Sequence, residues 1–345
     1  MSDYLELFRQ SLESRENRKD RDSKILIIDG LNMWIRTWSA IPVLSSSGDH
    51  VGAVAGYLKS IGSIIRQFDP TRVIIAFDGS GGSLRRRKVF SDYKSNRTPK
   101  IHQFKKEFSS LEEERESMKF QVSRSIEYLD RMPLTFVRID HIEADDTIAN
   151  IVNQYYDSET DITVVSTDRD FLQLITNTVK VWNPIRKILY DPEKIKEEYG
   201  LLPENYLLYR ILTGDNSDAI PGISGLGLKT LLKEYPLLEK KISIEEFIEI
   251  TVRKSEAKKP KKFVSEILSN QDKIKLNSQL MQLTDVDISL HSKNQIRDLL
   301  DMKIPTLKRG ELIRMAYKDG IVAGNWNFEN WLSNTFDSLN IWASV

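Results

Sequence analysis

The sequence contains no cysteine and only four histidines among its 345 residues. The absence of cysteine excludes disulfides, thiol nucleophiles and cysteine-ligated zinc sites. His50, His102, His141 and His291 lie far apart, so no HExxH-type zinc motif is present. No apolar run approaches the length of a membrane span, and the charged N-terminus lacks the apolar segment of a signal peptide. We therefore expect a protein of a reducing cytoplasm that makes no membrane contact.

The chain also lacks net charge, because 50 Lys and Arg residues balance 50 Asp and Glu residues. A uniformly basic surface for nucleic acid is therefore excluded, and any affinity for phosphate must come from local patches. Hydrophobic residues make up 40% of the chain, which is enough to build a core. At roughly 150 residues per domain, the length favours about two domains.

Short and continuously apolar stretches recur before residue 200. They predict buried strands at 25–28, 73–77, 134–137, 162–165 and 179–182. Continuous rather than alternating apolar runs are typical of strands that are covered on both faces. Helical spacing of apolar residues between these runs, as in 51–68, predicts an α/β fold with a parallel, doubly wound sheet.

After about residue 200 the strand pattern ends, and helices are predicted at 204–213, 226–235, 243–254 and 262–279. We expect an α/β domain over 24–199 and a helical region over 200–345. Residues 1–23 are polar and mixed in charge, which indicates a flexible N-terminal extension. The aromatic tail with Trp326, Trp331, Phe336 and Trp342 is typical of a terminal helix packed on the body, and docking to a partner protein is the alternative.

Acidic residues stand where predicted strands end or helices begin. The candidate carboxylates are Asp29, Asp78, Glu143, Asp145, Asp146, Asp168, Asp170, Asp215 and Asp218. The carboxyl ends of parallel strands share one edge of a sheet, so these acids can converge there. Their repulsion would then require cations, and ligands that are all oxygen favour magnesium or manganese. The chemistry of such a site is two-metal phosphoryl transfer. The alternative is that each acid serves only a turn or a helix cap.

A basic stretch opens the long connection between Asp78 and Glu143. Residues 84–106 contain nine Lys and Arg residues against one acid, Asp92. Such a patch attracts a phosphate backbone, and interleaved aromatic rings can stack on bases. The residues concerned are Arg85, Arg86, Arg87, Lys88, Lys94 and Arg97, with Phe90, Tyr93 and Phe104 among them. A solvated, charged helix hairpin is the alternative.

Two glycines, Gly225 and Gly227, lie at the start of the helix predicted at 226–235. A turn of this kind exposes backbone amides to an anion at a helix N-terminus, and Lys229 adds positive charge. A plain helix–helix turn is the alternative.

Together these motifs resemble the 5′-nuclease (flap endonuclease) superfamily, which includes phage 5′-exonucleases, T-even phage ribonuclease H and the 5′-exonuclease domain of bacterial DNA polymerase I. The resemblance covers about residues 24–235. It rests on 28–30 (IDG) with Arg36, 77–79 (FDG), 92–97 (DYKSNR), 143–146 (EADD), 166–170 (STDRD), 214–222 (GDNSDAIPG) and 223–230 (ISGLGLKT). It implies a PIN-like twisted parallel sheet, a helical arch over about 84–130, and a helix-turn-helix (H3TH-like) DNA-binding motif in the C-terminal helical region.

The resemblance also implies an activity, namely a magnesium-dependent 5′→3′ exonuclease and structure-specific 5′-flap endonuclease that removes RNA primers and flaps in DNA replication. Asp29, Asp78, Glu143, Asp145 and Asp146 would hold one Mg²⁺, and Asp168, Asp170, Asp215 and Asp218 the second, with Mn²⁺ as a substitute. Lys94, Arg97 and Asp146 would be catalytic, and the cut would leave a 5′-phosphate. Nucleic acid would contact Arg36, Arg85, Arg86, Arg87, Lys88, Tyr93, Gly225, Gly227 and Lys229. The loop 223–230 would hold a potassium ion.

The partners implied are branched or 5′-ended duplex DNA and RNA–DNA hybrids, in a bacterial or phage-infected cytoplasm. A single-strand-binding protein or another replication protein would dock to the termini. No polymerase domain follows, so we expect a stand-alone nuclease. Two alternatives remain at this stage. One is a clamp that binds branched DNA without hydrolysis, and the other is a PIN-type ribonuclease, which is typically shorter and lacks the arch and the glycine loop.

Three positions, in two motifs, depart from the family pattern. His141 and Ile142 stand where a glycine and an aromatic residue usually precede the EADD element. Ala219 replaces the usual asparagine in the run that ends at Gly222. Neither departure removes a carboxylate.

Overall fold

The computed structural model describes residues 22–343 except 41–42, 46–47, 98–107, 109 and 323–325. Almost all of the extension predicted over 1–23 lies outside the described residues, as do Lys100, Phe104, Lys105 and Lys106 of the basic stretch. No helix among the described residues combines the length and apolar character needed to cross a bilayer.

Six strands of the described chain form one sheet. They are β1 (Lys24–Asp29), β2 (Arg72–Phe77), β3 (Thr135–Arg138), β4 (Asp161–Val165), β5 (Val179–Asn183) and β6 (Ile188–Tyr190). Their order is β3-β2-β1-β4-β5-β6, and every pair is parallel except β5 with β6. The five predicted strands are confirmed. The antiparallel β6 was missed, because a strand of three residues is too short to show a pattern.

Alternate residues of each central strand face opposite layers of helices. Leu26 and Ile28 of β1 belong to one apolar cluster, whereas Ile25 and Ile27 belong to the other. All four side chains are buried. The continuous apolar run of β1 therefore reflects a sheet that is covered on both faces, as predicted.

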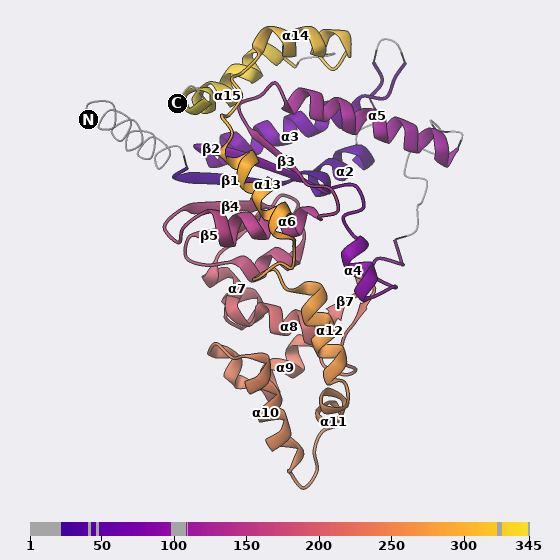
Figure 1. Cartoon of the computed structure of the whole chain (residues 1–345), viewed down its shortest axis with the longest axis vertical. Helices are drawn as coiled ribbons and strands as arrows, with labels where there is room; N and C mark the ends of the chain where they lie inside the picture. Colours follow the sequence, from indigo (N-terminus) through magenta and orange to yellow (C-terminus); the bar gives the residue numbers. More distant parts are fainter. Residues whose placement is uncertain are drawn as a thin grey trace, which may run out of the picture.

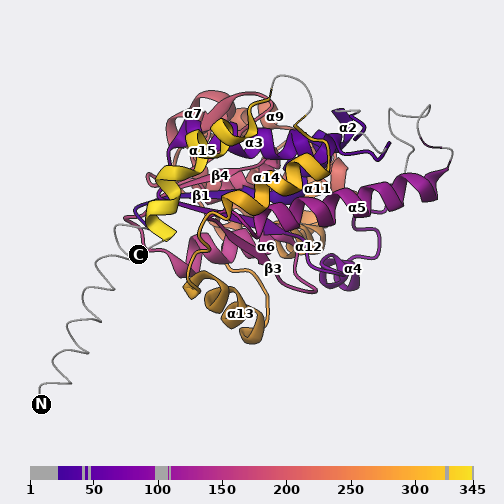
Figure 2. The ribbon, with the colours of Figure 1, turned by 90° about the horizontal axis from the view of Figure 1, so that it is seen from above.

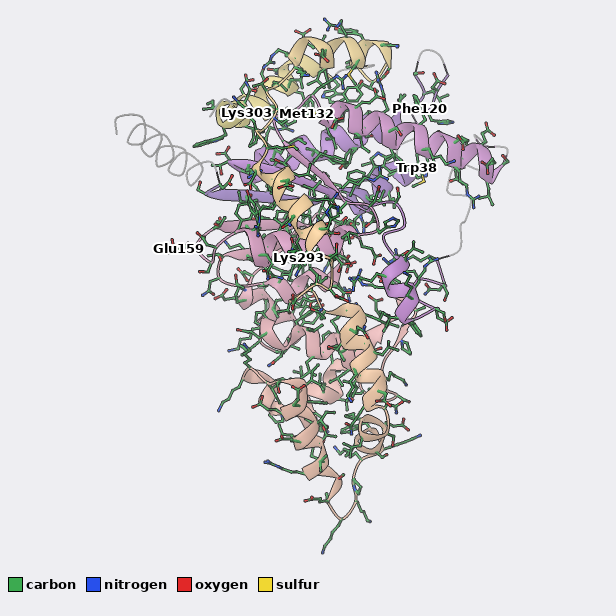
Figure 3. The ribbon with its side chains drawn as sticks, in the orientation of Figure 1. Trp38, Phe120, Met132, Glu159, Lys293 and Lys303 are labelled. Atoms are coloured by element: carbon green, nitrogen blue, oxygen red, sulfur yellow. The ribbon has the colours of Figure 1, made fainter. Side chains whose placement is uncertain are left out.

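One face of the sheet is covered by helices from both ends of the chain (Figures 1 and 2). They are α2 (Gly30–Ala40), α3 (Gly52–Phe68), α5 (Leu111–Leu129), α14 (Arg309–Lys318) and α15 (Phe328–Ala343). Phe328, Trp331 and Phe336 of α15 are buried in this layer, so the predicted packing of the aromatic tail on the body is confirmed. Figure 3 labels two further aromatic residues of this layer, Trp38, which is buried, and Phe120, which is exposed.

The other face carries α6 (Ala144–Asn150), which continues as a π-helical turn (Ile151–Tyr155), and the helices that follow the sheet. These are α7 (Pro192–Tyr199), α8 (Tyr206–Thr213), α9 (Leu228–Glu234), α10 (Ile244–Ser255), α11 (Lys262–Ser269), α12 (Gln271–Met281) and α13 (Leu290–Asp301). The helix predicted over 262–279 is divided at Asn270, whose φ of −118° is not helical. The α10–α11 pair and the α14–α15 pair lie at opposite ends of the molecule (Figure 1).

Capping residues set several of these helix boundaries. Asp191 accepts a hydrogen bond from the amide of Lys194, Pro192 occupies the first turn, and Gly200 ends α7 in the left-handed conformation. Ser243 and Glu246 form a reciprocal capping box at the start of α10.

Candidate active site

Three acids lie at the same edge of the sheet. Asp29 ends β1, Asp78 follows β2, and Asp168 comes three residues after the end of β4. Because β1 pairs in parallel with both β2 and β4, these residues leave the sheet in the same direction. The boundary between β1 and β4 is also where the strand order reverses, which is the place where open α/β sheets bind their ligands.

The acids of α6 meet this edge through a close backbone contact. The amide of Gly79 donates to the carbonyl of Ile142 at 2.9 Å. A Cβ atom at Gly79 would lie 1.8 Å from the carbonyl oxygen of Ile139, so only glycine permits the contact. As a result, Asp78 accepts a 2.7 Å hydrogen bond from the amide of Ala144, in the first turn of α6. Next to it, carboxylate oxygens of Glu143, Asp145 and Asp146 lie within 4.8 Å of one another.

A second group of acids comes from two further segments. Asp170 lies on the 3-10 helix η2 (Arg169–Leu174). Asp215 ends β7 (Gly214–Asp215), and Asp218 ends the 3-10 turn η4 (Asn216–Asp218) that leads to β8 (Ile220–Pro221). Gly214 has a φ of 72°, and a Cβ atom there would lie 2.4 Å from the amide nitrogen of Gly222, so this loop closes tightly only with glycine.

Asp168 connects the two groups. Its carboxylate is close enough to Asp145, Asp215 and Asp218 for their negative charges to raise its pKa, together with the larger effect of burial. The negative charges of Asp168 and Asp78 likewise raise the pKa of Asp29, so Asp29 lies near both. The structure thus brings all nine sequence-predicted acids into one region.

Burial and mutual repulsion disfavour the ionised form of several of these acids. Burial raises the pKa of Asp29 to about 7, and the charges of Asp168 and Asp78 add to this effect. Burial and Asp168 likewise raise the pKa of Asp170 to about 7. The pKa of Asp146 rises to about 6, chiefly through burial and the neighbouring Asp145. In the metal-free protein, the repulsion among these acids therefore destabilises their ionised forms.

Basic side chains offset part of this repulsion at the three acids at the start of α6, namely Glu143, Asp145 and Asp146. Arg86, on α4 (Leu84–Val89), is only 3% exposed and pairs with Asp146 at 2.9 Å, with Asp145 at 3.2 Å and with Glu143. Arg85 pairs with Asp146 at 2.7 Å. Lys94 also pairs with Glu143. The second group has its own partners, since Arg97 pairs with Asp218, and Arg210 pairs with Asp170 and Asp215.

The formal charges leave room for metal ions. Nine carboxylates face five ion-paired basic side chains, which leaves four negative charges, equal to the charge of two divalent cations. Within the described residues, Asp29, Asp78 and Asp168 have no ion-pair partner. An oxygen-only donor set with uncompensated charge suits Mg²⁺ or Mn²⁺.

Comparison with known proteins agrees with this geometry. Residues 24–200 match the family model described as the 5′-3′ exonuclease N-terminal resolvase-like domain. The chain belongs to this 5′-3′ exonuclease family. The matched region contains all six strands of the large sheet and the seven acids from Asp29 to Asp170.

Relatives and solved structures extend the comparison. DNA polymerase I of Caldicellulosiruptor bescii is 31% identical over 257 residues, which cover 71% of this chain and 28% of the polymerase. The chain therefore spans under a third of that relative. A 5′-3′ exonuclease of Aquifex aeolicus is 28% identical over 297 residues, 85% of this chain and 90% of the relative. In fold, the chain is similar to the bacteriophage T5 flap endonuclease in a pseudo-enzyme-product complex with DNA and metal ions, with a TM-score of 0.58, 19% identity, and coverage of 85% of this chain and 98% of that one.

Two residues expected to contact nucleic acid are placed otherwise. Arg86 is buried among the acids described above and also donates to the carbonyl of Leu280 at 2.9 Å. Tyr93 is only 2% exposed, because its ring packs in a cluster with Ile220 and Met281. The pattern of alternating basic and aromatic residues gave no sign of this burial, since the covering residues lie more than a hundred positions away.

The other expected contact residues lie nearer the surface. Arg87 and Lys88 are exposed, and Arg85 is half-buried. Arg36, also half-buried, donates to the hydroxyl of Thr167, beside Asp168. In the family's glycine loop 223–230, Ile223 and Leu226 are buried and anchor the backbone, whereas Gly225, Gly227 and Lys229 are exposed.

Sequence reasoning missed Arg210 and Ser166. Arg210 is the single charged residue in α8, whose sequence YLLYRILT is otherwise apolar or neutral. A lone charge in an apolar helix needs a buried partner, and this signal could have identified it. Ser166 hydrogen-bonds to Asp29, but a serine after a strand carries no distinctive signal.

Proposed function

We propose that this protein is a magnesium-dependent 5′-3′ exonuclease and 5′-flap endonuclease. The observation that carries the proposal is the meeting of nine carboxylates at one sheet edge, where Asp29, Asp78 and Asp168 have no ion-pair partner among the described residues. Membership of the 5′-3′ exonuclease family supports it. The similarity in fold to a flap endonuclease bound to DNA and metal ions points to branched DNA as substrate.

The acids would hold two ions. Asp29, Asp78, Glu143, Asp145 and Asp146 would hold the first, and Asp168, Asp170, Asp215 and Asp218 the second, with Mn²⁺ able to replace Mg²⁺. When bound, the ions would activate water for attack on the phosphodiester and neutralise the charge that develops on its oxygens. The uncompensated charge of the acids supports this occupancy.

Lys94 and Arg97 would stabilise the transition state. Both lie in the turn that follows α4, and this turn docks on the second acid group, because the amide of Lys94 donates to the carbonyl of Asp218 at 2.9 Å. Their cationic ends already touch Glu143 and Asp218, so a small movement would carry them onto a phosphate bound at the acids. Charge-assisted hydrogen bonds to the scissile phosphate would then favour cleavage that leaves a 5′-phosphate.

The rest of the substrate would contact surfaces on either side of the acids. Residues 84–130 would form the arch over the 5′ strand, with Arg87 and Lys88 exposed toward phosphate. The exposed loop 223–230 and Lys229 would grip duplex phosphates as an H3TH-like motif, with a potassium ion at backbone carbonyls. RNA–DNA hybrids would be cut as well as DNA, in primer removal, and a single-strand-binding protein would dock at a terminus. The polymerase I relatives support the replication role.

A labelled 5′-flap duplex, in RNA-primed and all-DNA forms, tests the proposal. Cleavage should require Mg²⁺ and leave a 5′-phosphate. Asp146→Asn should abolish cleavage while DNA binding persists, and the exposed Asp272→Asn should behave as wild type. Full activity of Asp146→Asn would refute the assignment. Binding without cleavage would instead indicate a clamp, and cleavage restricted to single-stranded RNA would indicate a PIN-type ribonuclease.

A further inference from the structure

Arg210 occupies the centre of the second acid group. It lies near the end of α8 and is 11% exposed. Its Nε donates to Asp170 at 2.9 Å, and its Nη2 pairs with Asp215. Asp170 belongs to η2 and Asp215 to the loop after α8, so one guanidinium joins two separate segments of the site.

Asp215 has three hydrogen-bond contacts without a metal ion. Its Oδ2 pairs with Arg210, and its Oδ1 accepts the amide of Ser217 at 2.7 Å and the hydroxyl of Ser217 at 2.6 Å. These donors occupy three of the roughly four acceptor positions of the carboxylate, so they compete with an ion for direct contact with Asp215. Asp170 differs, because Arg210 contacts its Oδ1 and no donor within the described residues contacts its Oδ2.

A fixed guanidinium also changes the affinity of this group for a divalent ion. Arg210 offsets one negative charge of the group, and its own positive charge repels an ion held by the same acids. In return it offsets part of the repulsion between Asp170 and Asp215 in the metal-free protein. The group can therefore stay assembled while no ion is bound.

We propose that Arg210 is a resident cation of the second acid group, a positioning residue that holds Asp170 and Asp215 together and weakens binding of the second divalent ion. Asp215 then acts through Arg210, and Asp168, Asp170 and Asp218 are the direct ligands of that ion. This inference rests on the proposed two-metal function.

Mn²⁺ binding to the whole chain without DNA, measured by titration calorimetry, tests the inference. Wild type should show a tighter and a weaker site. Arg210→Gln should strengthen the weaker site at least roughly tenfold, or ~1.4 kcal/mol, and leave the tighter site unchanged. Arg210→Lys keeps the charge and should resemble wild type. The control is Arg186→Gln, which removes an exposed ion pair with Glu198 and should change neither site.

Thermal unfolding gives a second readout. Arg210→Gln should lower the Tm of the metal-free protein and enlarge the increase in Tm that Mn²⁺ produces. If this variant does not fold without metal, Arg210→Gln/Asp215→Asn removes the cation together with its partner, and it should fold and still bind a second Mn²⁺.

Two results would overturn the inference. One is an unchanged or weakened second site in Arg210→Gln, and the other is loss of that site in the double variant. Failure of wild type to bind any Mn²⁺ would contradict the proposed function itself, so the two failures are distinguishable.

Discussion

Ser166, just after β4, donates a 2.8 Å hydrogen bond to the carboxylate of Asp29 at the end of β1. The same hydroxyl oxygen accepts the amide of Asp168 at 3.0 Å. One small side chain therefore fixes the spacing between two acids that have no ion-pair partner among the described residues. Its hydrogen bond also favours the ionised form of Asp29, against the larger effect of burial.

Ser166→Ala should weaken both the fold and the site. Loss of a buried hydrogen bond to a carboxylate should lower the free energy of unfolding by about 1–2 kcal/mol. It should also raise the pKa of Asp29 and weaken Mg²⁺ binding. Urea unfolding and Mg²⁺ titration measure these effects. Ser265→Ala, at an exposed helix position, is the matched control and should change stability by less than about 0.5 kcal/mol. Equal behaviour of the two variants would show that the bond to Asp29 contributes nothing.

The metal-free protein should lose stability as the pH rises from about 5 to about 7. The folded-state pKa values of Asp29 and Asp170 are about 7 and that of Asp146 about 6, all above the ordinary 3.8. In this window the folded state therefore binds more protons than the unfolded state, so raising the pH favours unfolding. Acids with lowered pKa values, such as Asp215, complete their titration below this window and do not oppose the trend.

Urea unfolding in a chelator at several pH values measures this dependence. Saturating Mg²⁺ should reverse its sign, since the ions bind the deprotonated acids and release protons. A metal-free stability that rises steadily over this pH range would contradict the raised pKa values.

The convergence of the acids could be predicted from the sequence, whereas the basic residues that pair with them could not. Asp29, Asp78 and Asp168 could be placed at one edge because parallel strands necessarily end there together. The pairing of Arg86 with the α6 acids could not be foreseen, because it depends on how α4 sits against α6 and α12. The burial of Tyr93 beside Ile220 and Met281 could not be foreseen for the same reason.

The positions of the C-terminal helices were equally hidden. The apolar spacing of α15 predicts that one face is buried, but it does not name the partner. Packing of α15 against α3 joins residues more than 250 positions apart, and Arg66 of α3 donates to Thr335 of α15. Such a pairing follows from the tertiary arrangement of the whole chain rather than from local pattern.

Asp168→Asn and Asp146→Asn should both raise the stability of the metal-free protein. Asp168 has no ion-pair partner among the described residues, and burial and neighbouring acids raise its pKa, so its neutralisation should raise the free energy of unfolding by about 1 kcal/mol. Asp146 pairs with Arg85 and Arg86, but burial and Asp145 still raise its pKa to about 6, so its neutralisation should act in the same direction. Both variants should lose cleavage. Urea unfolding in chelator measures both effects, and destabilisation of the protein by Asp146→Asn would show that its ion pairs outweigh burial and the repulsion from Asp145.

Ala219→Asn should stabilise the loop that carries Asp218. Ala219 has φ 60° and ψ 25°, the left-handed conformation, which costs alanine roughly 1 kcal/mol. Asparagine adopts this conformation more readily than alanine does. The substitution should raise the free energy of unfolding by about 0.5–1 kcal/mol in urea. Ala257→Asn is the control, because Ala257 is exposed and has no positive φ, so it should gain nothing. A gain of the same size at both positions would indicate a general effect of asparagine rather than relief of backbone strain at Ala219.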